Sequence, residues 1–233
     1  MFNKDSNNQV IIKGVISGDI TPREEEYGRF YETTIVVPRL SGENDVLKIS
    51  LPESIRASKC EGDTIAVLGQ FRSRNVMDGE KSRLELRIFA LSELDPESVD
   101  EKSTNLIMLS GFVCKPTSSR VTPFGREIAD ILLAVNRGHK KSDYLPCIAW
   151  STNARIASEL VVGDQVDIVG RIQSRKYNKK GFDGTIEQRT AYEVSITKIS
   201  TSSDNNSLNE TKIKRYFALN LEKIVVKYNK AQG

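Results

Sequence analysis

The sequence has few of the side chains on which most enzymes depend. It holds a single histidine, His139, in a polar run, and three cysteines with no C-x-x-C pair. It contains no Walker loop and no His-Glu-x-x-His, G-x-G-x-x-G or G-x-S-x-G segment. Histidine acid–base chemistry, nucleophilic triads, zinc sites and disulfide frameworks therefore have little material. We expect a protein that is not an enzyme, with no catalytic residues, no metal, no cofactor and no small-molecule substrate.

Long hydrophobic runs and a large net charge are also missing. No apolar segment approaches the roughly 18 to 20 residues of a membrane span, and the N-terminus lacks the apolar stretch of a signal peptide. An odd number of unpaired cysteines suits a reducing compartment, so we expect a cytoplasmic protein with no membrane partner. The formal net charge is only +3. A nucleic-acid partner would therefore have to be recognised through local clusters of charge.

The sequence does contain one pattern that occurs twice. Residues 10–91 and 106–198 match at an offset of 97 to 101 residues. The clearest match is between residues 62–74, GDTIAVLGQFRSR, and residues 163–175, GDQVDIVGRIQSR. Glycine, aspartate and arginine recur there in one register. A period this long indicates a duplicated domain and not a solenoid repeat.

Each copy reads as five short strands with a helix between the third and the fourth. This order predicts an all-β protein of two tandem five-stranded OB-fold barrels, because an immunoglobulin-like sandwich needs about seven strands. We place the first domain at residues 1–95, the second at 104–200, and a linker with a basic and apolar tail at 201–233. The expected strands are 9–16, 31–37, 46–51, 64–74 and 83–91 in the first copy and 106–114, 127–136, 144–150, 165–175 and 190–199 in the second.

The helices and the tail are less regular. We expect helices at residues 52–58 and 152–160, with Asn153 as the N-cap of the second. The tail from 212 to 228 fits the period of a helix and of a strand equally well. Because it is too apolar to stay fully solvated, we expect it to dock on an OB fold of its own chain or of a partner.

Aromatic residues accompany a basic stretch in the second copy. Tyr144, Trp150, Tyr177 and Phe182 lie on or beside polar strand segments. Cations neutralise phosphates along a groove and aromatic faces stack exposed bases, so this mixture is typical of single-stranded nucleic-acid binding. The alternative is that the aromatics are core residues and the basic hairpin is a solvated face. The cations around these aromatics are Arg171, Arg175, Lys176, Lys179, Lys180 and Arg189.

The second copy also carries a set of motifs in a specific order. They are residues 109–111 (LSG), 122–126 (TPFGR), 133–137 (LAVNR), 143–150 (DYLPCIAW), 163–177 (GDQVDIVGRIQSRKY) and 190–194 (TAYEV). With these motifs, residues 105–198 resemble bacterial single-stranded DNA-binding proteins of the SSB type. In such proteins three aromatic positions usually stack bases, and the resemblance places them on Tyr144, Trp150 and Tyr177. The basic residues of the fourth strand and its loop usually line the DNA path.

The first copy resembles that family only in outline. At the three positions where aromatics are expected, the first copy has Leu47 or its neighbour, Leu51 with Pro52, and Asn75. We expect the first copy either to bind weakly, through Arg72, Arg74 and Lys81, or to be mainly structural. The acidic, phenylalanine-tipped end that is usual in the family is also missing.

The resemblance implies sequence-tolerant binding of single-stranded DNA in replication, recombination or repair. Arg126 and Arg137 lie within matching motifs, and we include them among the binding residues. The sequence does not distinguish DNA from RNA. The alternative is an OB-fold adaptor, such as a primosome-like component, whose main ligand is another protein. The resemblance also implies a homodimer carrying four OB folds; the alternative is a monomer whose tail seals the junction between its two folds.

Overall fold

The computed structural model describes residues 7–25, 28–79, 81–138, 140–180, 184–201 and 217–219. Within these residues, eleven strands form one hydrogen-bonded sheet in the order β2-β3-β5-β4-β1-β6-β10-β11-β9-β8-β7. Additional pairings between β1 and β2 and between β6 and β8 close this sheet into two barrels. The predicted fold class, two tandem five-stranded OB folds, is confirmed.

The two barrels have the same strand order. The pairs β3–β5 in the first barrel and β9–β11 in the second are parallel, and the other pairs are antiparallel. The first barrel consists of β1 (Asn8–Glu25), β2 (Gly28–Pro38), β3 (Asn44–Pro52), α1 (Glu53–Arg56), β4 (Thr64–Asp78) and β5 (Lys81–Leu94). The second consists of β6 (Asn105–Val113), β7 (Ser118–Val121), β8 (Glu127–Arg137), β9 (Lys141–Trp150), α2 (Thr152–Ser158), β10 (Gln165–Lys180) and β11 (Ile186–Thr201). Two 3-10 turns, Pro96–Ser98 and Glu101–Ser103, lie between the barrels.

Two local expectations were wrong, and one strand was missed. The first helix has only four residues, one turn where we expected two. Asn153 does not cap α2, because Ser151 is the N-cap and the Asn153 Nδ2 donates to the Thr197 carbonyl at 3.1 Å. Strand β7 was not expected, since its four residues are all exposed and show no alternation of polar and apolar side chains.

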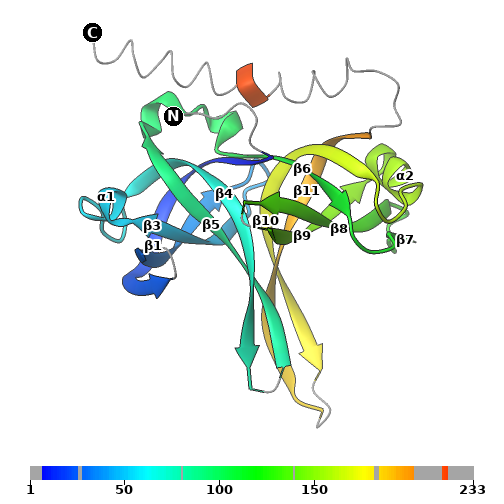
Figure 1. Cartoon of the computed structure of the whole chain (residues 1–233), viewed down its shortest axis with the longest axis horizontal. Helices are drawn as coiled ribbons and strands as arrows, with labels where there is room; N and C mark the ends of the chain where they lie inside the picture. Colours follow the sequence, from blue (N-terminus) through cyan, green and yellow to red (C-terminus); the bar gives the residue numbers. More distant parts are fainter. Residues whose placement is uncertain are drawn as a thin grey trace.

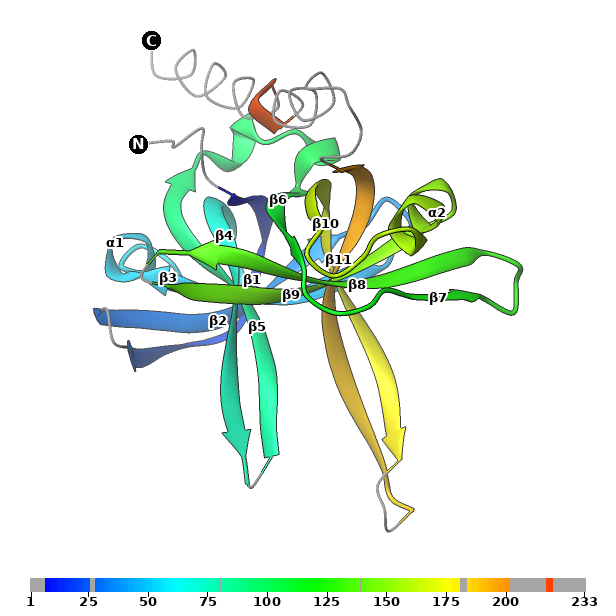
Figure 2. The same cartoon turned by 45° about the vertical axis from the view of Figure 1, so that its right-hand side comes forward.

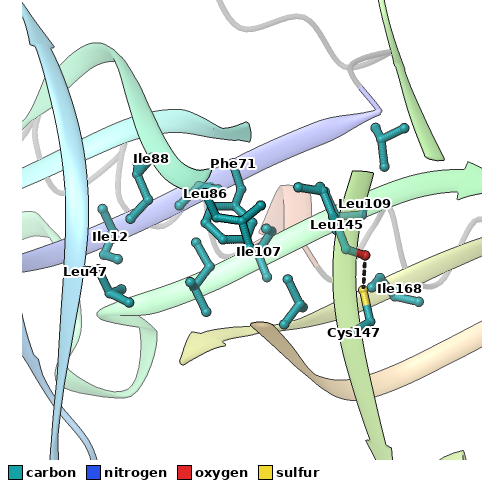
Figure 3. Close-up of a cluster of buried hydrophobic side chains, with 14 of the residues drawn as sticks. Ile12, Leu47, Phe71, Leu86, Ile88, Ile107, Leu109, Leu145, Cys147 and Ile168 are labelled. Carbon is teal, nitrogen blue, oxygen red and sulfur yellow. Dashed lines mark hydrogen bonds between the residues drawn. The ribbon is translucent and has the colours of Figure 1, made fainter. Parts of the chain in front are cut away.

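The core follows from the period-two alternation of apolar residues along the strands. Ile35 on β2 and Leu47 on β3, for example, are at most 1% exposed, while their neighbours point outward. The buried residues of both barrels form one continuous cluster. Figure 3 shows Phe71 and Ile107 between the two barrel interiors, with Cys147 at one end. The two folds therefore share a core and do not pack as separate bodies.

The recurring glycines of the duplicated run lie where a neighbouring strand approaches closely. A Cβ at Gly69 would come well inside 3.0 Å of the Phe89 carbonyl oxygen, and a Cβ at Gly170 would do the same against Ser195. Both glycines lie at a register shift, in the β4–β5 and β10–β11 pairs respectively. The glycine repeat in the sequence therefore marks the same bend in both barrels.

The two barrels are joined through their first strands. β1 and β6 pair antiparallel from Asn8 opposite Leu109 to Ile12 opposite Asn105. Asn8 bonds both the N–H and the carbonyl of Phe71, at 2.9 and 2.6 Å. Asn105 makes the same two bonds to Ile172, at 2.9 and 2.7 Å. Equal contacts made from both sides are the property of a two-fold axis, here within a single chain.

The asparagine contacts lie within each barrel, whereas another pair of equivalent contacts connects each barrel to the other. The Ser73 N–H donates to Asp143 Oδ1 at 2.8 Å, and the Tyr144 N–H donates to Ser73 Oγ at 2.7 Å. On the other side, the Ser174 N–H donates to Asp45 Oδ1 at 2.6 Å, and a backbone N–H of β3 donates to Ser174 Oγ at 3.0 Å. Each β4–β5 or β10–β11 hairpin is thereby fixed against the third strand of the other fold.

Beyond these contacts the two long hairpins extend away from the barrels. Figures 1 and 2 show the β4–β5 and β10–β11 hairpins projecting side by side in the same direction. The 3-10 turns between the barrels lie at the opposite end of the molecule. We call the projecting part of β10–β11, from Arg175 to Lys180 and from Ile186 to Ala191, the second arm. The corresponding part of β4–β5, from Arg74 to Asp78 and from Lys81 to Glu85, is the first arm.

One residue of the tail is packed against its own chain. Phe217 lies in a helical turn at 217–219 and is only 1% exposed. It joins a second apolar cluster, outside the barrel interiors, with side chains such as Ile11 of β1 and Met108 of β6. Since these residues come from both folds, Phe217 covers the joined sheet at the junction. Apart from Thr201, Ala218 and Leu219, the other residues of the tail lie outside those that the structure describes.

Candidate nucleic-acid interface

Two of the predicted aromatics lie on the outer face of the second barrel. Along β9, Leu145, Cys147 and Ala149 face the core. Tyr144 and Trp150 have the opposite parity and therefore point outward. Tyr144 is 44% exposed, and Trp150 is partly exposed. The alternative in which Trp150 is a core residue does not match this placement.

The third aromatic lies on the second arm. Tyr177 is opposite Arg189 and is 37% exposed. The guanidinium of Arg175 lies 5.9 Å from the centroid of the Tyr177 ring, within the range of a cation–π contact. The cations Lys176, Lys179 and Lys180 are exposed on the same strand. The arm therefore combines an accessible ring with a row of positive charges.

The remaining predicted cations are spread around this face. Arg126 is exposed in the turn before β8, near Trp150, because Ile128 of β8 is opposite Trp150. Arg137 ends β8 near Tyr144, and its Nη1 is 3.4 Å from Asp143 Oδ1. Phe182 lies outside the described residues.

Arg171 differs from the others because it is used at the junction between the folds. Its Nη1 donates to Asp45 Oδ2 at 2.9 Å, and its Nη2 to Gln173 Oε1 at 2.9 Å. Arg39 binds the same aspartate through Nε at 2.9 Å. Asp45 is 1% exposed, so Arg171 neutralises a buried carboxylate. On the symmetry-related side, burial raises the pKa of Asp143 above its ordinary value.

The register identifies the first-fold counterparts of the three aromatics. In the β2–β3 pair, Val46 lies opposite Val36, which is the position that Tyr144 has opposite Ala134 in the β8–β9 pair. In the same way, Pro52 lies opposite Phe30, as Trp150 lies opposite Ile128. On the first arm, Val76 is opposite Arg83 as Tyr177 is opposite Arg189. The first counterpart is Val46, the neighbour of Leu47, whereas the expected position Asn75 was one residue off. The counterparts are therefore Val46, Pro52 and Val76, none of which is aromatic.

The first-fold cations are engaged within the fold. Arg72 donates to Gln70 Oε1 at 2.6 and 3.1 Å and lies over the Phe89 ring, 4.7 Å from its centroid. Arg74 donates to Glu85 Oε2 at 2.5 and 2.8 Å. Phe89 also packs edge-on against Phe30, with the two centroids 4.5 Å apart. This aromatic pair was missed because its rings come from strands two and five and match none of the family positions.

The junction residues were also missed, although the sequence holds a signal for them. Asp45 and Asp143 are 98 residues apart, and Ser73 and Ser174 are 101 apart. These are the offsets of the surrounding repeat. Polar residues that recur in the repeat register could have been read as a repeated contact.

The described residues give no indication of a metal site or a membrane span. Within them, no group of three or more histidine, cysteine, aspartate or glutamate side chains could hold a metal ion. None of the helices in this part of the chain is long and apolar enough to cross a membrane.

The fold and this face together define a class of protein. The chain is a tandem OB-fold protein in which the second fold presents an aromatic and basic outer surface. Residues 104–202 match the family model described as "Single-strand binding protein family", so the second fold is similar to the members of that family.

Individual relatives agree with the family match. The "Single-stranded DNA-binding protein A" of Bacillus subtilis is 34% identical over 85 residues, covering 33% of this chain and 49% of the relative. The "Single-stranded DNA-binding protein 3" of Streptococcus agalactiae is 36% identical over 85 residues, covering 33% of this chain and 62% of the relative. The chain spans about half the length of most of the curated relatives it matches.

The likeness to solved structures extends over both folds. The wild-type single-stranded DNA binding protein from Thermus aquaticus superposes with a TM-score of 0.60 at 21% identity, covering 86% of this chain and 95% of that one. A deletion mutant of the same protein gives 0.61 at 19% identity, with 86% and 97% covered. At this identity the likeness establishes the tandem fold alone.

Proposed function

We propose that this protein binds single-stranded DNA with little sequence preference and without enzymatic activity, mainly through its second fold. The observation that carries the proposal is the outward placement of Tyr144 and Trp150 on one barrel face, next to an arm that presents Tyr177 among cations. The names of the relatives, all of them single-stranded DNA-binding proteins, support it. Replication, recombination or repair is the setting in which such binding is useful.

Each residue type has a distinct role in this proposal. The aromatic rings stack on bases, each contributing about 1–3 kcal/mol, and the cations neutralise phosphates. The stacking residues are Tyr144, Trp150, Tyr177 and Phe182. The phosphate-binding residues are Arg126, Arg137, Arg171, Arg175, Lys176, Lys179, Lys180 and Arg189, with smaller contributions from Arg72 and Arg74.

The proposed domain division supports separate roles for the two folds. We propose boundaries at residues 1–95 and 104–200, with 201–233 as linker and tail. Strands β1–β5 fall within the first range, and β6–β11 fall within the second except for Thr201, the last residue of β11. The second fold provides the aromatic face, and the first fold stabilises it through the joined sheet. The free cysteines Cys60, Cys114 and Cys147 agree with a reducing compartment, the cytoplasm.

A titration with oligo-dT, oligo-rU and duplex DNA over a range of salt concentrations tests the proposal. Trp150 is the only tryptophan, so stacking of a base on it should quench the protein fluorescence. We expect log affinity for oligo-dT to fall with log salt, by about 0.7 for each phosphate neutralised. Equal affinity for duplex DNA, or no response to salt, would favour the protein-binding adaptor instead.

The assembly state is a separate proposal. The family resemblance supports a homodimer with four OB folds, whereas Phe217 packed on its own chain suits a monomer with a sealed junction. Light scattering on the full chain distinguishes them, since the monomer mass is 26.1 kDa. A monomer mass without DNA would overturn the dimer.

A further inference from the structure

One carboxylate on the outer face of the first fold holds three cations. Glu85 lies on β5, and its side chain is 11% exposed. Its Oε1 accepts from Lys48 Nζ at 2.8 Å. Its Oε2 accepts from Arg74 at 2.5 and 2.8 Å and from Arg87 Nη2 at 2.8 Å. The cations come from strands β3, β4 and β5 and meet at Glu85 across the width of the face, and Arg87 also pairs with Glu32 of β2.

The physical chemistry of this cluster is that of an anion site. Burial by itself would raise the pKa of Glu85, but the hydrogen bonds and charges of Lys48 and Arg74 outweigh it and lower the pKa. Glu85 is therefore ionised at neutral pH. Guanidinium groups bind carboxylates and phosphates in the same forked geometry. A set of cations that accommodates the Glu85 carboxylate therefore also suits a phosphate oxygen.

The second fold has no such carboxylate at the equivalent position. Arg74 is opposite Glu85 on the first arm, and Arg175 is opposite Ala191 on the second. Without a carboxylate across the hairpin, the Arg175 side chain is 57% exposed, whereas that of Arg74 is 28% exposed. The carboxylate that Arg175 approaches is Glu193, at 3.8 Å, and its guanidinium also lies over the Tyr177 ring. The same arginine is therefore presented to solvent in one fold and held inward by a carboxylate in the other.

The cluster also adjoins an open recess and the second arm. A recess of about 290 Å³ opens beside it and is lined by Lys48 and Arg87, but also by the carboxylates Asp19 and Glu32. The recess is large enough for a phosphate group, whose approach the two cations favour and the two carboxylates oppose. Strand β3 carries Lys48, and two residues earlier the Val46 N–H donates to Ser174 next to Arg175. A strand that leaves the second arm can reach the cluster directly.

We infer that the outer face of the first fold carries a second phosphate site for single-stranded nucleic acid, and that the Glu85 carboxylate fills this site as an internal competitor. The inference rests on the proposed function and deepens it. It explains why the first fold keeps cations at family-like positions and yet presents little open positive charge. The predicted ligand is a phosphodiester group of the same strand that stacks on the second fold.

The direct test is Glu85→Gln in the full chain, with oligo-dT long enough to reach both folds. Glutamine keeps the shape of the side chain and removes its charge. We expect binding at low salt to tighten by about fivefold, and the salt slope to steepen by about 0.7 to 1.4, as one or two more phosphates are neutralised. Glu97→Gln is the matched control, because Glu97 is exposed in the turn between the barrels at the far end of the molecule (Figure 1).

A second comparison does not depend on whether the Glu85→Gln variant folds. In the native chain, Arg74→Gln should change oligo-dT affinity by no more than about twofold, whereas Arg175→Gln should weaken it by about tenfold. Adding Arg74→Gln to Glu85→Gln should remove the gain. Circular dichroism melts confirm that each variant is folded.

Two results would overturn the inference. One is a Glu85→Gln protein that matches Glu97→Gln in both affinity and salt slope. The other is an Arg74→Gln protein that loses as much affinity as Arg175→Gln. If the native chain binds oligo-dT with quenching of Trp150, these outcomes reject the first-fold site alone. If the native chain does not bind, the proposed function fails and the inference fails with it.

Discussion

Replacement of Tyr177 by alanine is the sharpest test of the binding face. Tyr177 is on a projecting arm, pairs with Arg189 and makes no contact with the barrel cores. Loss of its ring removes one stacked base, about 1–3 kcal/mol. It also releases Arg175 from a cation–π contact of about 0.5–1 kcal/mol, which offsets part of that loss. The net loss is about 0.5–2 kcal/mol, or about 2- to 30-fold in Kd.

The assay is the oligo-dT titration at a fixed low salt concentration, followed through Trp150. Val76→Ala is the matched control, because Val76 occupies the same register position on the first arm and should leave the affinity unchanged. Tyr177→Phe keeps the ring and should retain binding within about twofold. The melting temperature should not change for any of the three. Equal affinities for Tyr177→Ala and Val76→Ala would refute stacking on this arm.

The remaining predictions concern stability and its pH dependence. Phe217→Ala should lower the free energy of unfolding in urea by up to about 3 kcal/mol, whereas Leu219→Ala, at a position 45% exposed, should change it by less than about 0.5 kcal/mol; equal effects would mean that the tail is not docked. Gly170→Ala forces a Cβ against the carbonyl of the neighbouring strand and should cost about 1–3 kcal/mol. Gly138→Ala meets nothing within 4 Å and serves as its control. The lowered pKa of Glu85 contributes stability above the unfolded-state pKa, about 4.3, and this stability is lost as pH falls through the folded-state pKa. The urea midpoint of the native chain should therefore fall more steeply below about pH 5 than that of Glu85→Gln, and parallel curves would contradict the ion cluster.

The strands could be predicted because their information is local. Alternation along residues 31–37 and 46–51 reproduces the buried faces of β2 and β3, since period two is a property of the strand itself. The ends of the strands were less accurate: β10 was expected to end at 175 but continues to Lys180. Its last six residues are exposed and polar, and only cross-strand hydrogen bonds to β11 keep them extended. Asn153 failed as a cap because a partner distant in sequence, Thr197, takes its side chain.

The candidate site was partly visible in the sequence for the same reason. Alternation along β9 put the side chain of Trp150 on the same face as Ile148 and on the opposite face from Cys147. Which of these two faces points into the barrel is decided only by the tertiary structure. Tyr144 and Tyr177 could be named from motifs, but their distance from one another depends on the course of a long hairpin. Arg171 shows the limit most clearly, because its partner Asp45 is 126 residues away and in the other fold.

The sequence by itself determined the duplication, the strand order of each fold, the family that the second fold resembles and the aromatic residues at its expected binding positions. All of these depend on residue types and spacing within about ninety residues. Only the tertiary structure decided that the folds share one sheet and one core, that Phe217 covers their junction, and that Glu85 holds three first-fold cations. The physical reason is that these contacts join side chains from different strands or folds, and their distances are set by the closure of the sheet. Charge at an outer face is therefore determined by which partners the fold brings together.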